Sequence, residues 1–272
     1  MKDKHYELAD LLRIMERLRD PDHGCPWDQA QDFKSIVPST LEECYELAAA
    51  IEAEDYAHLE DELGDVLFQV IFYAQLGAER ALFDFSSVVQ VLCEKLLRRH
   101  PHVFADGLIE GVVNASIESD EVKTQWEAIK ASERQHKALH GVLDDVPVAL
   151  PALPRAQKLQ KRAARVGFDW SEIAPVLAKL DEEIVELKAA VDAGNHASME
   201  DELGDVLFTT VNMARHLKVD AESALRRSSS KFEARFRAME AVAADRGESL
   251  SALDDEQLDT LWNAAKAVQN ST

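Results

Sequence analysis

The sequence is poor in helix-breaking residues and in cysteine. It has 10 Gly and 8 Pro among 272 residues, which favours long uninterrupted helices over a turn-rich sheet protein. The 3 cysteines, Cys25, Cys44 and Cys93, are odd in number and share no recurring spacing. This pattern indicates neither a disulfide framework nor a zinc site, so we expect three reduced thiols.

Long hydrophobic runs and an excess of positive charge are also lacking. No apolar run approaches the ~18 residues that cross a bilayer, and the N-terminus leads into an amphipathic stretch that does not resemble a signal peptide. We therefore expect a soluble, cytoplasmic protein with no membrane partner. The balance of 30 Lys+Arg against 51 Asp+Glu gives a net charge of −21. That charge argues against direct nucleic-acid binding, because phosphate backbones are bound through a surplus of Lys and Arg.

One acidic helical segment occurs twice. The nine residues Glu60–Phe68 recur without change at Glu200–Phe208. Upstream, Glu-Glu-x-x-Glu at 42–46 matches the same pattern at 182–186, and both segments are separated from their copies by 140 residues. The chain therefore contains two copies of one unit.

The predicted architecture is all-α, with two homologous helical-bundle repeats. We expect an N-terminal repeat over residues 1–145, a Pro-containing linker over 146–154 and a C-terminal repeat over 155–272. Periodicity predicts helices at 5–19, from Ser39 or Thr40 onward, at 56–82, from Asp84 to before Pro101, around Trp126, and at 156–165, 175–193, 198–217, 221–246 and 256–268.

The repeated carboxylates predict a metal site. Residues three apart share a helix face, so two antiparallel helices would bring four carboxylates together as hard oxygen ligands, with Mg²⁺ the expected ion. The sets are Glu43, Glu46, Glu62 and Asp65 in the first repeat and Glu183, Glu186, Glu202 and Asp205 in the second. An arbitrary acidic pair usually lies on a solvated face, but the apolar neighbours here predict that at least Asp65 is partly buried. Gly64 and Gly204 lie mid-helix, which suggests that a neighbour or ligand approaches closely there.

Basic and aromatic residues could complete a binding site for an anion. Lys231 and Arg235 lie one turn apart and suit phosphate oxygens, and Trp262 offers a stacking face close to Lys266. The alternative is that Lys231 and Arg235 form ordinary surface pairs and Trp262 fills the core.

These motifs together resemble the MazG family. The resemblance is carried by the paired acidic motifs, by Arg19–Asp28 (RDPDHGCPWD) and by Arg98–Phe104 (RRHPHVF). It implies an all-α fold shared with dimeric dUTPases and phosphoribosyl-ATP pyrophosphohydrolases, Mg²⁺ dependence, a homodimer, and cleavage of nucleoside triphosphates, NTPs and dNTPs, to monophosphate and pyrophosphate. The implied role is nucleotide-pool housekeeping or stress regulation linked to ppGpp.

The family pattern also implies roles for individual residues and makes the C-terminal repeat the main catalytic unit. The metal ligands would be Glu183, Glu186, Glu202 and Asp205, and the nucleotide-binding residues Lys179, Glu182, Lys231, Arg235, Trp262 and Lys266. Asn212 corresponds to Phe72 of the first repeat. Its side chain could read a base or sugar edge, or it could simply pack against a neighbouring helix. Our hypothesis for the chemistry is in-line attack by a water at the α-phosphorus, with Glu182 or Glu183 orienting that water.

Two other classes of protein remain as alternatives. A di-iron carboxylate bundle would need Glu-x-x-His twice, and the sequence has it once, at Glu133–His136, outside the duplicated motif. The second alternative is a catalytically inactive helical regulator that binds a nucleotide or a toxin–antitoxin partner through the same surface.

Overall fold

The computed structural model describes residues 5–113, 118, 121–122, 125–126, 128–129, 132–133 and 141–269. These residues form helices and connecting turns without a β-strand, which confirms the all-α prediction. They divide into two compact units, Met1–Glu133 and Arg134–Thr272. Within the described residues, no helix is both long enough and apolar enough to span a bilayer.

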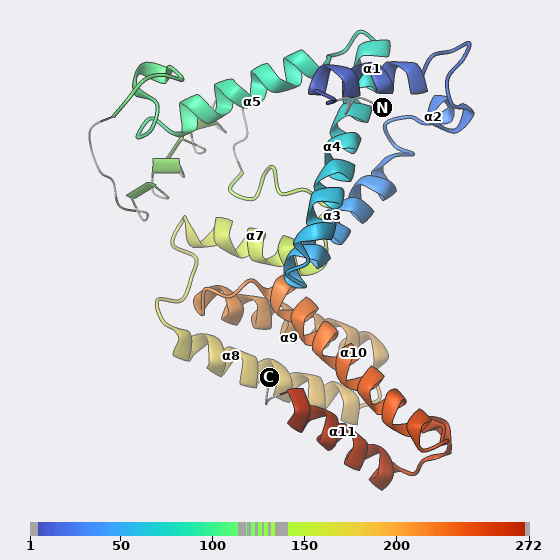
Figure 1. The fold of residues 1–272 in the computed structure, drawn as a ribbon. Coiled ribbons are helices and arrows are strands. Elements are labelled where there is room, and N and C mark those ends of the chain that lie inside the picture. Colours follow the sequence, from blue (N-terminus) through green and yellow to red (C-terminus); the bar gives the residue numbers. More distant parts are fainter. Residues whose placement is uncertain are drawn as a thin grey trace. The chain divides into compact units, whose positions relative to one another are not determined.

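The helices of each unit are drawn in Figure 1. Unit 1 contains α1 (Leu8–Leu18), α2 (Pro26–Ala30), α3 (Val37–Glu52), α4 (Tyr56–Glu79), α5 (Phe85–Arg99) and the short 3₁₀ helix η1 (Ala105–Gly107). Unit 2 contains α7 (Ala152–Ala164), α8 (Ile173–Asp192), α9 (His196–His216), α10 (Ala221–Asp245), η2 (Leu250–Ala252) and α11 (Asp255–Gln269).

Most predicted helices are present, and their ends have identifiable causes. Asp84 caps α5 as predicted, because its Oδ1 accepts a 2.7 Å hydrogen bond from the backbone N–H of Ser87. The predicted start of α3 at Ser39 or Thr40 is wrong. The helix already begins at Val37, because Pro38 lies in its first turn, where the missing proline N–H costs nothing. The helix expected around Trp126 lies partly outside the described residues.

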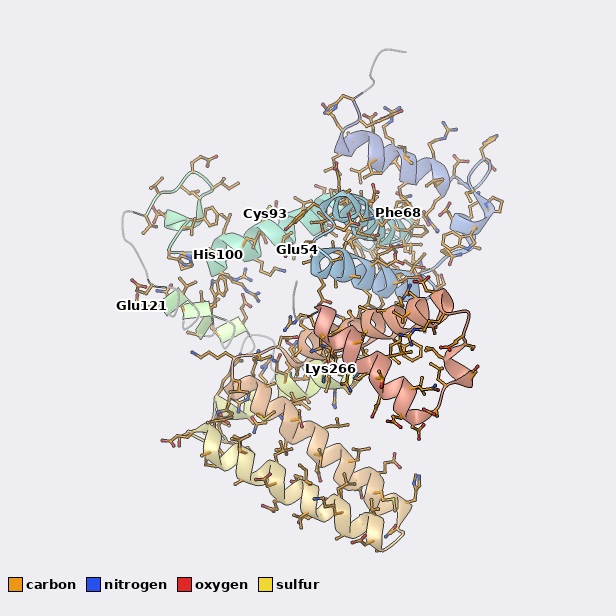
Figure 2. All side chains as sticks on the ribbon, turned by 60° about the horizontal axis from the view of Figure 1, so that its bottom comes forward. Glu54, Phe68, Cys93, His100, Glu121 and Lys266 are labelled. Atoms are coloured by element: carbon orange, nitrogen blue, oxygen red, sulfur yellow. The ribbon has the colours of Figure 1, made fainter. Side chains whose placement is uncertain are left out.

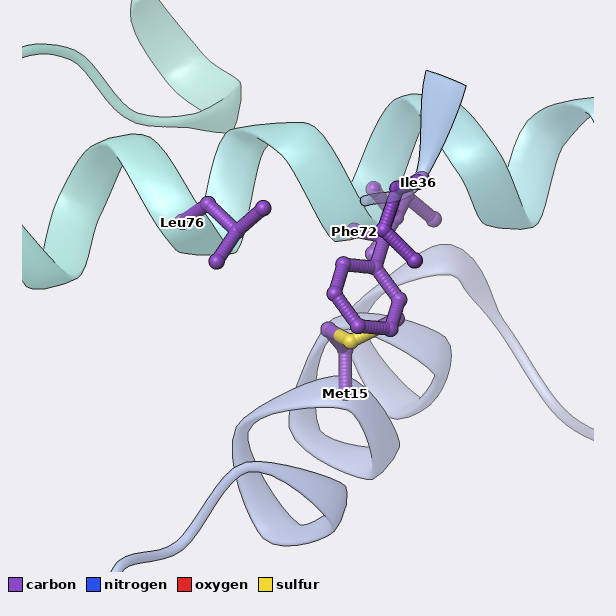
Figure 3. Close-up of a cluster of buried hydrophobic side chains, with 5 residues drawn as sticks. Met15, Ile36, Phe72 and Leu76 are labelled. Carbon is purple, nitrogen blue, oxygen red and sulfur yellow. The ribbon is translucent and has the colours of Figure 1, made fainter. Parts of the chain in front are cut away.

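The core of unit 1 forms where α1 and the start of α3 pack against α4. Figure 3 shows Met15, Ile36, Phe72 and Leu76 meeting there, and each is at most 1% exposed. The guanidinium of Arg19 lies 5.2 Å from the centre of the Phe72 ring. Arg19 also donates two 2.7 Å hydrogen bonds to the Glu79 carboxylate, so its charge is neutralised beside the core.

The central part of α4 is buried on one side only. Ile71 and Phe72 are buried, whereas Leu67 is 39% and Val70 41% exposed. The apolar side chains of Leu67 and Val70 are therefore left partly uncovered by the described residues.

Unit 2 is organised around the α8–α9 hairpin. The two helices are joined by residues 193–195, and so short a loop makes them antiparallel neighbours. Gly194 takes the left-handed conformation (φ 65°) that ends α8. Helix α7 packs against α9 and begins at Ala152, within the predicted linker.

Truncating Phe72 should destabilise unit 1 strongly. We expect Phe72→Ala to lower the free energy of unfolding by about 3–5 kcal/mol, because the substitution leaves a cavity in the core. Urea unfolding followed by circular dichroism measures the change. Tyr56→Ala, at a side chain that is 71% exposed on the same helix, is the matched control and should change stability by less than about 0.5 kcal/mol. Equal effects of the two substitutions would contradict this description of the core.

Candidate metal and nucleotide site

Three carboxylates of each repeat converge. Oxygens of Glu183, Glu202 and Asp205 all lie within 4.8 Å of one another, and the first repeat brings Glu43, Glu62 and Asp65 together in the same way. In each repeat one glutamate comes from the first helix of the hairpin, and a glutamate and an aspartate come from the second. The fourth predicted ligands, Glu46 and Glu186, lie outside these three-residue groups.

Burial within the groups differs from the prediction. Asp65 is exposed, as is Asp205, so the expectation that Asp65 is partly buried is wrong. The buried member of the second repeat is Glu183, which is 5% exposed. The reason is that Glu183 lies on the side of α8 that faces α9 and the interior of unit 2.

The carboxylates repel one another. Desolvation, followed by the charges of Asp65 and Glu46, raises the pKa of Glu43. Desolvation and the charge of Glu46 likewise raise the pKa of Glu62, whose Oε2 is buried without a hydrogen-bond partner among the described residues. In the second repeat, desolvation and the charge of Glu202 raise the pKa of Glu186. Such a set of oxygens is unfavourable by itself and suits a hard divalent cation.

Lys179 distinguishes the second repeat. Its Nζ lies 2.7 Å from Oε1 of Glu182 and 2.8 Å from Oε1 of Glu183. The hydrogen bonds to Glu182 and Glu183 raise the pKa of Lys179, so it stays protonated at neutral pH. The corresponding residue of the first repeat, 140 positions earlier, is Ser39.

A cavity opens beside this group in unit 2. Its volume is about 590 Å³, and Lys179, Glu183 and Asp205 line one part of it. The aromatic residues Phe168, Trp170 and Phe208 also line it, together with the polar residues Gln160, Asp169, Thr209, Asn212 and Arg215. The cavity therefore joins a charged region to an apolar one, as a nucleotide site requires.

A hydrogen-bonded network holds the polar wall of the cavity. Arg215 pairs with the Asp169 carboxylate through both terminal nitrogens; Nη1 donates to Oδ2 over 2.8 Å. Arg215 also donates to Oδ1 of Asn212, over 3.1 Å from Nε and 2.6 Å from Nη2. His216 Nε2 lies 3.2 Å from Oδ1 of Asp169. The hydrogen bonds from Arg215 are the main cause of a lowered pKa at Asp169.

The remaining predicted nucleotide-binding residues do not line this cavity. Lys231 and Arg235 lie on α10, and Trp262 and Lys266 on α11 (Figure 2 labels Lys266). The ring of Trp262 lies 5.3 Å from that of Phe232 and 5.7 Å from the Arg235 guanidinium. These four assignments stay predictions.

The mid-helix glycines border open space. A Cβ added at Gly64 or Gly204 would have no atom within 4 Å among the described residues. The close neighbour suggested by the sequence is therefore not found among the described residues.

Sequence reasoning missed most of the cavity wall. It did not single out Gln160, Phe168, Asp169, Trp170 or Arg215. One signal was available, because Gly-x-x-Trp occurs both at 24–27 and at 167–170. Gln160 gave no signal, since helix packing brings it from α7 to the Phe208 carbonyl of α9. Arg215 lies three residues from Asn212 on α9, but its pairing with Asp169, 46 residues earlier, depends on tertiary packing.

The di-iron alternative gains no support. Glu133 is paired with Arg98 at 2.8 Å and Arg99 at 2.5 Å, and hydrogen bonds from these arginines lower its pKa to about 2. Its carboxylate is therefore engaged with two cations; His136 lies outside the described residues.

Fold and site together define a class of protein: an all-α chain with two helical repeats, each bearing a convergent group of carboxylates. The model of the MazG nucleotide pyrophosphohydrolase domain matches residues 31–104 and 172–240. The chain belongs to this family.

Similar proteins cover nearly the whole chain. It is 51% identical to a nucleoside triphosphate pyrophosphohydrolase of Escherichia coli (strain K12), over 96% of this chain and 97% of that one. It is 42% identical to the nucleoside triphosphate pyrophosphohydrolase/pyrophosphatase MazG of Thermotoga maritima, over 98% of both chains. A crystal structure of a MazG-related protein from Thermotoga maritima matches 46% of this chain and 99% of that one, at 28% identity and a TM-score of 0.38.

The Asp169–Arg215 pair predicts a pH-dependent contribution to stability. Asp169 has a pKa below its ordinary 3.8 in the folded protein, so its contribution is present above that value and is lost as the pH falls through the lowered pKa. We expect Asp169→Asn to lower the free energy of unfolding by about 1–3 kcal/mol near neutral pH. Urea titrations from about pH 7 to about pH 3 should show this difference shrinking only below about pH 4. A difference that grows in acid would contradict the pairing.

Proposed function

We propose that the protein is a nucleoside triphosphate pyrophosphohydrolase that releases nucleoside monophosphate and pyrophosphate from NTPs and dNTPs. The observation that carries this proposal is a cavity with aromatic walls that is lined by Glu183 and Asp205, two of the three converging carboxylates. The names of the relatives support the same reaction. Regulation of the nucleotide pool, in housekeeping or in a ppGpp-linked stress response, is the corresponding cellular role.

Mg²⁺ is the proposed cofactor. Glu183, Glu186, Glu202 and Asp205 would hold it, and Glu43, Glu46, Glu62 and Asp65 form a second set. The donor set fits, because desolvation and the charges of neighbouring carboxylates raise the pKa of Glu43 and Glu62 in the first repeat, and carboxylate oxygens are hard ligands. When bound, the ion supplies positive charge for the triphosphate and lowers the pKa of a water.

The residues around the cavity have separate tasks in this proposal. Lys179, held at the edge by Glu182 and Glu183, contributes a permanent positive charge for phosphate oxygens. Glu182 or Glu183 would orient the attacking water; of these two, Glu183 lines the cavity. For Lys231, Arg235, Trp262 and Lys266, the proposed contact with the nucleotide depends on the family resemblance alone.

The C-terminal repeat, residues 155–272, is the proposed main catalytic unit, with residues 1–145 as the N-terminal repeat and 146–154 as the linker. Two replacements in the first repeat support this assignment. Ser39 takes the place of the cationic Lys179, and the buried Phe72 takes the place of the cavity-lining Asn212.

A homodimer is the proposed assembly. Beside Gly204, α9 exposes Leu203 (48%) and Leu207 (51%), and α8 exposes Val185 (63%). The first repeat exposes Leu63 and Leu67 at the same positions. An apolar stripe flanking an open glycine fits a second copy of the same hairpin. We propose no direct partnership with nucleic acid or a membrane.

Removing one carboxylate of the second repeat tests the enzyme against the inactive regulator. We expect Glu202→Gln to lower dGTP turnover in Mg²⁺ by at least about 100-fold, because the substitution removes a charged metal ligand. Assays that separate pyrophosphate from orthophosphate identify the bond that is broken. Glu200→Gln, an exposed acid two residues away, is the control and should stay active.

The same substitution in the first repeat tests the division of labour. Glu62→Gln should retain most of the turnover while lowering the number of Mg²⁺ ions bound per chain. Retained turnover in Glu202→Gln would refute the site, and loss of turnover in Glu62→Gln alone would assign catalysis to the first repeat. Orthophosphate as the product would refute α–β cleavage.

A charge in the exposed stripe tests the dimer. Leu207→Glu should shift the protein towards monomer, because the interface would then bury an unpaired carboxylate. Analytical ultracentrifugation of the full chain measures the change. Leu225→Glu, at a 58% exposed leucine of α10, should leave the mass unchanged; the opposite result would move the interface to α10.

A further inference from the structure

Two buried amides face the same cavity from different helices. Gln160 of α7 is 7% exposed and Asn212 of α9 is 6% exposed, and both line the cavity beside the aromatic residues. Buried amides need partners for both the oxygen and the nitrogen, and in each of these two amides the described residues bond to one of the two atoms.

Arg215 fixes the orientation of Asn212. Both hydrogen bonds from Arg215 go to Oδ1 of Asn212. Arginine has no acceptor, so Nδ2 cannot occupy that place and the amide must turn its two N–H donors away from Arg215. Asp169 in turn holds Arg215 through two hydrogen bonds.

A backbone carbonyl fixes the orientation of Gln160. Its Nε2 donates to the carbonyl oxygen of Phe208 over 2.8 Å, and a carbonyl oxygen cannot donate, so the side chain cannot be reversed. The other end, Oε1, is buried and has no hydrogen-bond partner among the described residues. An unpaired buried acceptor is costly unless a donor reaches it.

We propose that Gln160 and Asn212 read the edge of the substrate's nucleobase: Asn212 donates to a ring acceptor, and Gln160 accepts from an adjacent N–H group of the base. This inference depends on the proposed function, because it places a nucleotide in the cavity. Phe168, Trp170 and Phe208 supply the apolar walls beside the amides. Arg215 and Asp169 are positioning residues that act through Asn212.

The proposal defines a substrate class. The preferred base carries an acceptor and an N–H donor side by side, as adenine does at N1 and its amino group. A purine without the exocyclic group leaves Oε1 of Gln160 unpaired and should be rejected. The first repeat has no equivalent reader, since Phe72 is fully buried at the position of Asn212.

Binding of non-hydrolysable analogues to the full chain tests the role of Gln160. We expect the α,β-methylene analogue of ATP to bind about tenfold more tightly than that of purine riboside triphosphate, which lacks only the amino group. Isothermal titration calorimetry in Mg²⁺ measures both affinities. Gln160→Met should bring their ratio close to one, whereas Gln90→Met on α5, at an exposed glutamine, should leave it unchanged.

The role of Asn212 is tested with ring analogues. Wild type should discriminate against the 1-deaza or the 7-deaza analogue of the same nucleotide, each of which lacks one ring acceptor. Asn212→Asp keeps an oxygen for Arg215 but removes the donor, so it should discriminate against neither. Arg215→Met should cause the same loss of discrimination, and Arg215→Lys should restore part of it.

The outcomes separate this inference from the proposed function. Equal affinity of wild type for the ATP and purine riboside analogues overturns the base-reading pair without any variant, as does an unchanged ratio in folded Gln160→Met. Either result together with pyrophosphate release leaves the proposed function intact. Base-dependent binding that is lost in Gln160→Met, with no pyrophosphate released from any natural triphosphate, overturns the function and supports the pair.

Discussion

Repulsion between carboxylates held on two antiparallel helices is the constraint on which the rest of the site depends. The α8–α9 hairpin places Glu183 opposite Glu202 and Asp205, and the same hairpin in unit 1 raises the pKa of Glu43 and Glu62. Folding alone gains nothing from such an arrangement, because charges of one sign weaken the folded state. Lys179 offsets part of this repulsion in the second repeat, and a bound metal ion would offset it in both repeats.

Both repeats have the converging carboxylates, but the residues that surround the carboxylates differ between the repeats. In unit 2 the Asp169–Arg215 pair supports the amide of Asn212 at the cavity wall. In unit 1 the comparable Arg19–Glu79 pair lies against the ring of Phe72, which fills the core. An arginine–carboxylate pair thus supports a polar group facing a cavity in one repeat and a packed ring in the other. The first repeat places a core side chain at the position where the second places an amide at the cavity wall.

The sequence predicted the all-α fold, most helices and the pairing of Glu183 with Glu202 and Asp205, because these depend on helical periodicity and a short hairpin. It failed where tertiary packing decides. The exposure of Asp65 depends on which helices cover α4, and the spacing of residues along α4 does not predict which helices these are. The cavity wall is likewise assembled from α7, the segment before α8, and α9, which are separate in the chain. Gln160 has no signal in its own neighbourhood, and its importance follows only from the Phe208 carbonyl beside it.

The cavity separates two demands on a nucleotide enzyme. In the proposed complex, any triphosphate would meet the charged region with Lys179 and Glu183, whereas the amides of Gln160 and Asn212 would meet only the base, which varies between nucleotides. The two regions share α9, which carries Asp205 and Asn212 two turns apart, but their hydrogen bonds are separate: Lys179 pairs with glutamates of α8, and Arg215 pairs with Asp169. In this proposal, substitutions in the Asp169–Arg215–Asn212 network change base preference without disturbing the carboxylates, because no hydrogen bond or ion pair among the described residues joins the network to them.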